Sequence, residues 1–327
     1  MTVPYNGGAR NAGPLGFSSG GIGGRVPGPM GRTLWQKQSI APAGATATKA
    51  LTVTVMPPPS KTSTVMEARM VSWDLFKGEP ATTDVRQGEL ATCPIASILA
   101  ALAHTAWGQK HIKSMVKEHK TTAGVTTTLA TDVVKELARK LDDDPDYRKP
   151  SSKIISDRYF IVTLGGKSID VSDVFYTAYT DGTSLNPIYM QARPPASPEK
   201  AREALWPAVI EKAYAVQVGS YEKLDDYGPT GTTLDVYWTT ILGLGPQTIA
   251  VTDATALSTI SSAAAKASQS PTVGASKKTA TKVSDTHGFA VMGIQGSQVE
   301  LYDAWGKTVK ISLEDFRSNF DLMLRKP

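Results

Sequence analysis

One segment limits the folds open to this sequence more than any other, the stretch CPIASILAALA that begins at Cys93. Its isoleucine and leucine residues recur at helical spacing, and alanines occupy most of the other faces of the same helix. A helix that is apolar all round is stable only where protein surrounds it, so this segment is expected in the centre of a globular core. Pro94 suits the first helical turn, and Cys93 is therefore expected at or just before the first helical residue.

The use of cysteine and histidine excludes the common ways of stabilising a small secreted protein. Cys93 is the single cysteine among 327 residues, so no internal disulfide can form, and four scattered histidines leave no cysteine-rich zinc framework. A chain of this length can bury a core without such help. No apolar run is long enough to span a membrane, and the first residues lack a secretory signal. We expect a protein without a membrane span, in a reducing compartment such as the cytoplasm.

The net charge of +5 is confined to the amino-terminal tail. Five of the 35 Lys and Arg residues lie in residues 1–60, where no Asp or Glu occurs, so the other 30 balance the 30 acidic residues. Proteins that bind nucleic acid take most of their affinity from concentrated basic side chains that contact phosphates. We therefore expect no nucleic-acid partner for residues 61–327.

Residues 1–60 are rich in glycine and proline and are expected to be disordered. Such a stretch cannot bury enough apolar surface to fold by itself. Three roles stay open for it: a flexible leader, a pro-segment that covers an active site, or an address for a dedicated secretion system. The protein is accordingly expected either in the cytoplasm or, as an effector, inside another cell into which it is delivered.

Beyond the tail, the pattern predicts an α+β protein with two parts of different character. Residues 65–194 are expected to be mostly helical, with a second helix over 129–141. A Gly-Gly turn in this part also predicts a hairpin that joins strands over 155–162 and 169–175. Residues 195–327 are expected to be richer in strands.

This second part is expected to begin with a helix over 199–218. Runs of branched and aromatic residues then predict strands over 239–244, 289–294 and 299–302. The stretch 254–285 is rich in Ala, Ser, Thr and Lys, and is expected to hold one helix over 256–267 and otherwise a mobile loop.

Cys93 is the first candidate for a catalytic residue. The thiolate is the reactive form of cysteine, and the amino terminus of a helix lowers the pKa of a thiol by stabilising the negative charge. A lone cysteine beside an alanine-rich buried helix is, however, more often an inert part of a core. The position of Cys93 alone leaves both interpretations open.

A predicted hairpin places a histidine next to an acid. Strands 289–294 and 299–302 are joined by the turn-like sequence QGSQ, so they are expected to pair antiparallel. His287 enters the first strand and Asp303 leaves the second, which puts their side chains opposite or diagonal, roughly 5–8 Å apart. Such an acid can hold one tautomer of the imidazole and stabilise the imidazolium. His287 is therefore the candidate base, and Asp303 is its orienting partner.

Four blocks of the sequence, taken together, resemble a known family. In chain order they are Gln87 to Cys93 (QGELATC), Trp206 to Ala215 (WPAVIEKAYA) followed by Gly219 to Glu222 (GSYE), His287 to Val291 (HGFAV), and Asp303 to Gly306 (DAWG). These blocks, in this order, are similar to those of calpains, a family of papain-like cysteine proteases. The resemblance covers residues 65–327.

This resemblance implies a papain-like fold with two lobes and the substrate in the cleft between them. A helical lobe over 65–194 would carry Cys93, and a β-rich lobe over 195–327 would carry His287 and Asp303. The asparagine of the family is Asp303 here, and a carboxylate can still accept the hydrogen bond of the imidazole N–H.

The resemblance also implies residues that contact the substrate. The side-chain amide of Gln87 and the backbone N–H of Cys93 would hold the negative charge that builds on the carbonyl oxygen under attack. Gly288 and Trp305 would lie beside the bound substrate, although shielding of the histidine–acid pair is the simpler role for Trp305.

The sequence departs from the family on both sides of the nucleophile. Thr92 stands where calpains have an aspartate that helps to bind calcium, and Pro94 replaces their tryptophan. The resemblance therefore implies neither calcium activation nor a particular substrate preference, and we expect no cofactor and no metal.

Together, these residues predict an endopeptidase that cleaves protein or peptide substrates through a Cys–His–Asp triad and a thioester intermediate. Two alternatives stay open. A thiol acyltransferase or amidase would form the same thioester, whereas a catalytically silent module would use the same site only to bind a peptide.

Overall fold

The computed structural model describes residues 51–55, 66–71, 73–88, 90–129, 153–180, 184–187, 204–219, 221–224 and 233–327. These residues form an α+β protein with helices and mostly antiparallel sheets, as the sequence predicts. Most of the tail over 1–60 lies outside the described residues, as does the predicted helix over 129–141 apart from Leu129.

The described helices include one, α1, that is buried on every side. In chain order the helices are η1 (Thr82–Asp84), α1 (Cys93–Ala103), α2 (Ala106–Met115), α4 (Trp206–Val218), η3 (Glu222–Leu224), α5 (Leu234–Leu242), α6 (Leu257–Ala265) and α7 (Leu313–Asn319). Every residue of α1 is buried, which confirms that the apolar segment forms a central helix. None of the described helices is both long and apolar enough to cross a membrane.

Three sheets contain the described strands. The first, in the order β1-β3-β4-β5, consists of Leu51–Val55, Val116–Leu129, Lys153–Leu164 and Lys167–Ser172. The second, in the order β2-β6-β7, consists of Met66–Met70, Val174–Thr180 and Ser184–Pro187. The third, in the order β12-β11-β10-β9-β13-β8, consists of Lys307–Ser312, Gln298–Asp303, Gly288–Gln295, Thr272–Ser276, Phe320–Arg325 and Gln247–Ala250. Their pairs are antiparallel, except that β1 runs parallel to β3.

The described residues between 65 and 194 contain more strand than their sequence pattern predicts. Mostly helical structure is expected there, yet its described residues form strands β2 to β7 and only the helices α1, α2 and η1. The lysine-rich start of β3 hides its strand pattern. In its last residues, however, Val125, Thr127 and Leu129 are buried and the residues between them are partly exposed. Threonine and valine favour strands because their branched side chains fit a pleated surface.

Strand β1 lies inside the stretch for which the composition predicts disorder. Its sequence LTVTV is rich in branched residues that favour strands, and it pairs with the end of β3 from Val125 to Leu129. The prediction of a disordered tail is therefore wrong for residues 51–55.

The carboxy-terminal part confirms some predictions and corrects two. β10 and β11 pair antiparallel, and α6 occupies the predicted helix. Residues 239–244 are predicted to be a strand, but most of them belong to α5, because the buried side chains from Leu234 onward lie at helical spacing. The stretch 254–285 is not only a loop around α6, since it contains β9, a buried strand inside the third sheet.

Two other predicted elements are present with small changes. The strands β4 and β5 form the hairpin expected around the Gly-Gly turn. The helix expected over 199–218 is α4, which begins at Trp206 and ends where Gly219 adopts a left-handed conformation with φ of +97°. Glycine commonly ends helices in this way because it has no Cβ to clash.

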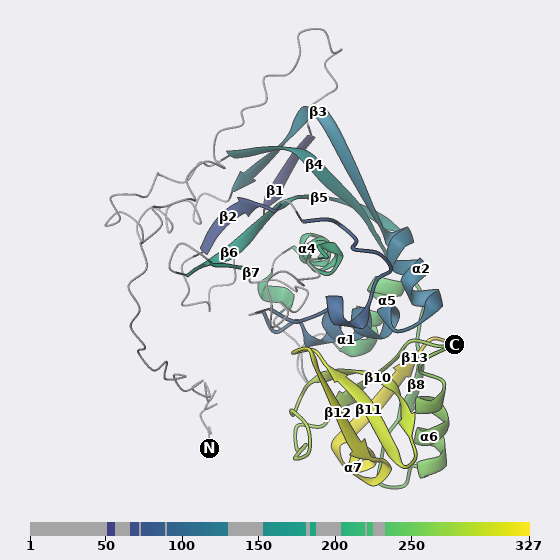
Figure 1. The fold of residues 1–327 in the computed structure, drawn as a ribbon. Helices are drawn as coiled ribbons and strands as arrows, with labels where there is room; N and C mark the ends of the chain where they lie inside the picture. Colours follow the sequence, from purple (N-terminus) through teal and green to yellow (C-terminus); the bar gives the residue numbers. More distant parts are fainter. Residues whose placement is uncertain are drawn as a thin grey trace, which may run out of the picture. The chain divides into compact units, whose positions relative to one another are not determined.

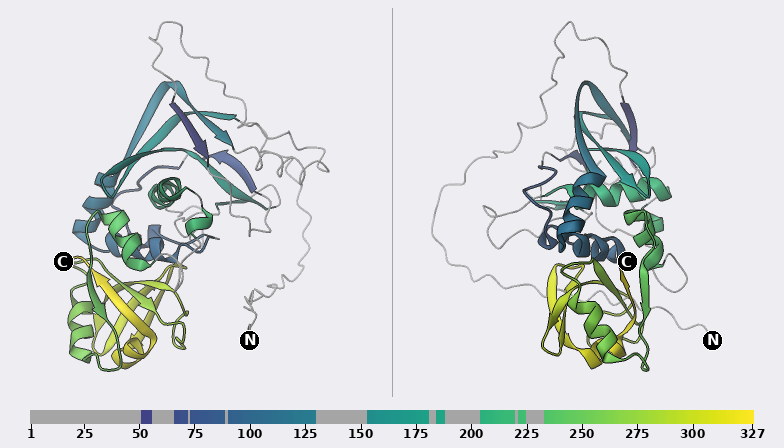
Figure 2. Two further views of the ribbon diagram at one scale, coloured as in Figure 1. Left: turned by 180° about the vertical axis from the view of Figure 1, so that it is seen from behind. Right: turned by 90° about the vertical axis from the view of Figure 1, so that its right-hand side faces the viewer.

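The buried helix α1 lies between other helices and the third sheet (Figure 1). It packs against α2, α4 and α5, and it also contacts strands β9, β10 and β11. The helix α4 in turn packs against β4 and β5 of the first sheet, as two further views show (Figure 2). This arrangement brings the amino end of α1, with Cys93, next to Gly288 at the start of β10.

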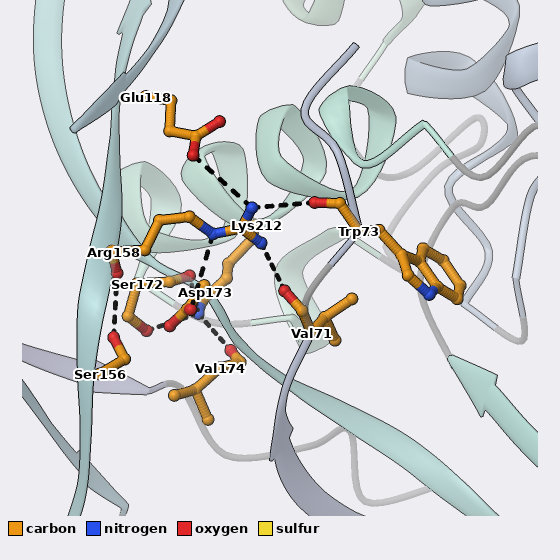
Figure 3. A network of polar contacts seen from close by, with 9 residues as sticks. All are labelled: Val71, Trp73, Glu118, Ser156, Arg158, Ser172, Asp173, Val174 and Lys212. Atoms are coloured by element: carbon orange, nitrogen blue, oxygen red, sulfur yellow. Dashed lines mark hydrogen bonds and ion pairs between the residues drawn. The ribbon is translucent and has the colours of Figure 1, made fainter. Parts of the chain in front are cut away.

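A polar network around Arg158 ties β4 to the chain that precedes α1 (Figure 3). The Arg158 guanidinium donates to the carbonyl oxygens of Val71 and Trp73, the second at 2.9 Å. It also lies 3.7 Å from a carboxylate oxygen of Glu118 and 3.7 Å from one of Asp173. The Arg158 side chain is only 11% exposed, so these groups are the partners of a largely buried charge.

Lys212 of α4 is buried in the same region and has three acceptors. Its Nζ donates to the carbonyl oxygen and the hydroxyl of Ser172, both at 3.0 Å, and to the carbonyl oxygen of Val174 at 2.5 Å. Burial lowers the pKa of Lys212 to about 7, although the charge of Asp173 raises it. Three acceptors match the three hydrogens of an ammonium group. Lys212 thus anchors α4 to the turn between β5 and β6.

Candidate active site

Cys93 is the first residue of α1, where the sequence places it. Thr92 precedes the helix as its N-cap with a non-helical backbone, and Pro94 follows in the first turn. The cysteine is buried, with 5% of its surface exposed. At the amino end of a helix, the Cys93 side chain lies at the positive end of the helix dipole.

His287 and Asp303 meet as the hairpin predicts. In the register of β10 with β11, Phe289 lies opposite Asp303, so His287 is the diagonal neighbour of the acid. The Nε2 atom of His287 lies 2.9 Å from Oδ1 of Asp303, and both residues are 7% exposed. The same Oδ1 accepts a hydrogen bond from the backbone N–H of Trp305 at 2.9 Å. The carboxylate that orients the imidazole is therefore itself held in place.

The other side of the imidazole faces Cys93. Because Nε2 is bonded to Asp303, Nδ1 is the ring nitrogen that is left to interact with the Cys93 side chain. Burial by itself lowers the pKa of His287, but the hydrogen bonds with Asp303 and Cys93 and the negative charge of both groups outweigh it and raise the pKa to about 9. The site therefore favours the imidazolium at neutral pH.

The raised pKa of His287 implies a specific dependence of stability on pH. With a pKa of about 9 in the folded protein and the ordinary 6.5 in the unfolded chain, the imidazolium stabilises the fold fully below pH 6.5. This contribution disappears as the pH rises through 9. We expect the difference in free energy of unfolding between the wild type and His287→Gln to shrink over this interval. Urea denaturation at several pH values measures it, and a difference that stays constant or grows contradicts the assigned environment.

Trp305 lies beside His287 with its ring nearly parallel to the imidazole. The two ring centroids are 6.4 Å apart, and their planes differ by 2°. Trp305 keeps 45% of its surface exposed, whereas His287 is buried. This placement suits a side chain that shields the histidine–acid hydrogen bond from water. Shielding and substrate binding both stay predictions for Trp305.

Strand β9 holds the backbone of His287 through two hydrogen bonds that are not predicted from the sequence. The N–H of His287 donates to Oγ of Ser276 at 2.9 Å, and the N–H of Ser276 donates to the carbonyl oxygen of His287 at 2.9 Å. Thr286, just before the base, has φ of +48°, a conformation that residues other than glycine rarely adopt. The composition of residues 254–285 predicts mostly a loop, and the short branched stretch at Thr272-Val273 is the signal that indicates a strand there.

Gln87 lies between the segment before Cys93 and the turn after Asp303. Its Nε2 donates to the carbonyl oxygen of Leu90 at 2.6 Å, and its backbone N–H donates to the carbonyl oxygen of Ala304 at 2.7 Å. The residue is buried, and the bond to Leu90 uses one of the two hydrogens on Nε2. The structure thus brings Gln87 to the site, and its role as an oxyanion donor stays a prediction.

Gly288 packs directly on the amino end of α1. A Cβ added to Gly288 would lie 2.7 Å from Oγ of Ser97 and 3.0 Å from the carbonyl oxygen of Cys93. The absence of a side chain therefore lets β10 approach the helix that carries the thiol. This close packing is the role that the structure gives to Gly288, and a contact with substrate stays a prediction.

Replacing Gly288 with alanine should push β10 away from α1. We expect the free energy of unfolding to fall by about 1–3 kcal/mol, the usual cost of overpacking. Cys93 should also react more slowly with a thiol probe, because the imidazole moves away from the sulfur. Gly245→Ala is the matched control, since a Cβ there meets no atom within 4 Å. Chemical denaturation and labelling followed by intact mass measure both effects. If Gly288→Ala has the stability and the labelling rate of the wild type, the packing of β10 on α1 at this position is not tight.

The other histidines do not share this site. Each has a partner elsewhere: the carbonyl oxygen of Met292 for His104, the ring of Trp107 for His111 and the ring of Tyr159 for His119. Within the part of the chain that the structure describes, no group of three or more His, Cys, Asp or Glu side chains is arranged to hold a metal ion. The expectation that the protein needs no cofactor stays a prediction.

A scan against protein-family models found no match to this chain, and a search of the curated proteins found none either. The geometry around Cys93, together with the sequence pattern that predicts it, is therefore the basis for assigning a function.

Proposed function

We propose that this chain is a cysteine endopeptidase with a calpain-like catalytic core. The observation that carries the proposal is the hydrogen bond between His287 and Asp303, together with the Cys93 side chain, which acts on the same imidazole. A nucleophile, a base beside it and a buried acid that orients the base form the general arrangement of activated nucleophiles. Helix α1 supplies the thiol and the third sheet supplies the base and acid, which supports a papain-like division of the site between two lobes.

The proposed reaction follows from the positions of these groups. The thiolate of Cys93 attacks the carbonyl carbon of a peptide bond, and the imidazolium of His287 protonates the amine as it leaves, so that a thioester remains. The neutral imidazole then takes a proton from water, which hydrolyses the thioester and regenerates the thiol. Asp303 keeps the proton on Nε2 and stabilises the imidazolium.

Gln87 is proposed to stabilise the charge that develops on the substrate oxygen. Its buried amide has a hydrogen beyond the one donated to Leu90, and the backbone N–H of Cys93 is the natural second donor at a helix terminus. Removing one such donor typically slows an enzyme by roughly 10²–10³-fold, so this pair is a substantial part of the proposed catalysis.

The proposal is tested by covalent labelling and by product analysis. The full chain is treated with an epoxysuccinyl probe and, separately, with a denatured protein substrate, and both reactions are followed by mass spectrometry. Because Cys93 is the single cysteine, a thiol adduct can lie only there. We expect rapid addition of one label and the appearance of new peptide ends, and Cys93→Ala should abolish both.

The same experiment separates the other possible activities. With an amine added to the reaction, an acyltransferase would transfer the acyl group to the amine in place of water. A silent binding module would bind a peptide without cleaving it. Labelling as slow as that of an ordinary thiol would overturn the proposal.

A further inference from the structure

The residue before the nucleophile does not act as an ordinary helix cap. A threonine at an N-cap usually accepts a hydrogen bond from a backbone N–H in the first helical turn. Thr92 makes no such bond, and Pro94 in that turn has no N–H to offer. Instead, the hydroxyl of Thr92 donates to Oε1 of Glu211, on α4, at 2.5 Å.

This contact lies in the interior of the protein. Thr92 and Glu211 are both fully buried, with 0% of their surface exposed. A carboxylate is costly to bury unless it is hydrogen-bonded, and a bond to a charged acceptor is stronger than one between neutral groups. A buried acid in a helix that is otherwise largely apolar therefore needs hydrogen-bond partners such as Thr92.

The position of Thr92 suggests what the contact controls. The N–H of Thr92 donates to the carbonyl oxygen of Leu90 at 2.8 Å, and its own carbonyl oxygen accepts from Ala96 at 3.0 Å. Leu90 also accepts the Nε2 hydrogen of Gln87 at 2.6 Å. The peptide that joins Thr92 to Cys93 carries the backbone N–H of Cys93, so one connected set of bonds orients both proposed oxyanion donors.

The helix α4, which carries Glu211, is also held to the turn after β5. Lys212, the neighbour of Glu211, fixes α4 to Ser172 and Val174 through three hydrogen bonds. Two consecutive residues with ionisable side chains on one buried helix thus hold the turn after β5 and the residue before the thiol. The helix α4 joins the first sheet to the start of α1 through them.

We propose that Glu211 and Thr92 are positioning residues that set the direction of the Cys93 N–H relative to Gln87. This inference rests on the proposed peptidase function and deepens it. The carboxylate of Glu211 fixes the Thr92 side chain, and through it the peptide unit whose N–H faces the substrate oxygen. Neither residue touches the substrate.

The test compares two reactions of the same thiol. Alkylation by iodoacetamide is a displacement at carbon that creates no oxyanion, so its rate reports only on the thiolate. Cleavage of a peptide and binding of a peptide aldehyde both place charge on a carbonyl oxygen. In Thr92→Val, which keeps the side-chain shape but removes the hydroxyl, we expect kcat to fall by about 10- to 100-fold, the size of effect that small misplacements produce. The affinity for the peptide aldehyde should fall by a similar factor, whereas KM and the alkylation rate should stay nearly unchanged.

Matched variants make the result specific. Thr92→Ser keeps the hydroxyl and should restore kcat, and Glu211→Gln keeps an oxygen that accepts the same bond and should also stay close to the wild type. If Thr92→Val does not fold because it leaves a buried carboxylate without this donor, the double variant Thr92→Val, Glu211→Gln removes the same bond without that charge. Failure of both valine variants to fold would overturn the inference, because the pair would then serve stability alone.

The outcomes also separate the inference from the function on which it rests. A wild type that neither cleaves peptides nor is labelled rapidly refutes the peptidase proposal and the inference with it. An active wild type, together with a Thr92→Val variant that has the same kcat and aldehyde affinity, refutes the inference alone. Equal losses in alkylation and in cleavage would also refute it, since the effect would then lie on the thiolate.

Discussion

Replacing His287 with alanine is expected to slow peptide cleavage by about 10²–10⁴-fold, the usual contribution of a general acid–base. The variant loses the group that is proposed to protonate the leaving amine and to activate water. It also loses the imidazole that is proposed to activate the Cys93 side chain. Alkylation of Cys93 at pH 7 should therefore slow as well. Initial cleavage rates and intact-mass labelling measure the two effects on the same preparations.

His119→Ala is the matched control for this experiment. The ring of His119 stacks on Tyr159 in the first sheet and takes no part in the site, so its loss should leave cleavage and labelling close to the wild type. A His287→Ala variant that is labelled at the wild-type rate would mean that Cys93 is an ordinary thiol. The silent binding module would then be the better interpretation.

Replacing Arg158 with methionine is expected to lower the free energy of unfolding by about 3–5 kcal/mol, the range measured when one partner of a buried ion pair is removed. The variant takes the donor away from the carbonyl oxygens of Val71 and Trp73. It also leaves the carboxylate of Asp173, whose side chain is 8% exposed, without the guanidinium beside it. Urea denaturation at pH 7 measures the loss.

Two further variants define the cause of this loss. Arg158→Lys keeps the charge but not the planar fork of donors, so an intermediate loss is expected. Lys278→Met removes a positive charge from an exposed position and should change stability by less than about 0.5 kcal/mol. If Arg158→Met is no less stable than Lys278→Met, the network around Arg158 contributes nothing measurable to the fold.

Those parts of the site that depend on local signals could be predicted from the sequence. The helix α1 is one continuous apolar stretch with a proline at its start, and the hairpin of β10 and β11 is two strands around a short turn. The register of this hairpin by itself makes His287 and Asp303 neighbours. Neither prediction requires knowledge of how distant segments pack.

Contacts between distant segments could not be predicted in this way. The stretch that contains β9 has the composition of a loop, and it becomes a buried strand because β10 and β13 pair with it on either side. The strand β3 begins with lysines and becomes recognisable only once its partners β1 and β4 are known. In both cases tertiary pairing overrides a weak local preference.

The bond between Thr92 and Glu211 is of the same long-range kind, although a signal for it exists. Glu211 and Lys212 lie side by side in a helix that is otherwise apolar over most of its length. Charged residues in such surroundings need partners, so the pair indicates buried polar contacts even though the sequence does not name them. The partners of both residues emerge only from the fold.

The two contacts of the imidazole have different origins. His287 meets Asp303 through the pairing of adjacent strands, but it meets Cys93 only because β10 docks on α1 at Gly288. The proposed catalytic groups therefore come from two parts of the fold, the His287–Asp303 pair of the hairpin and the Cys93 sulfur of α1, which meet where β10 packs on α1 at Gly288. If β10 moved slightly away from α1 at Gly288, Cys93 would lose its contact with the imidazole, while the bond between His287 and Asp303 would stay intact. Restoring the contact would then require only that β10 pack on α1 again, without refolding of the hairpin.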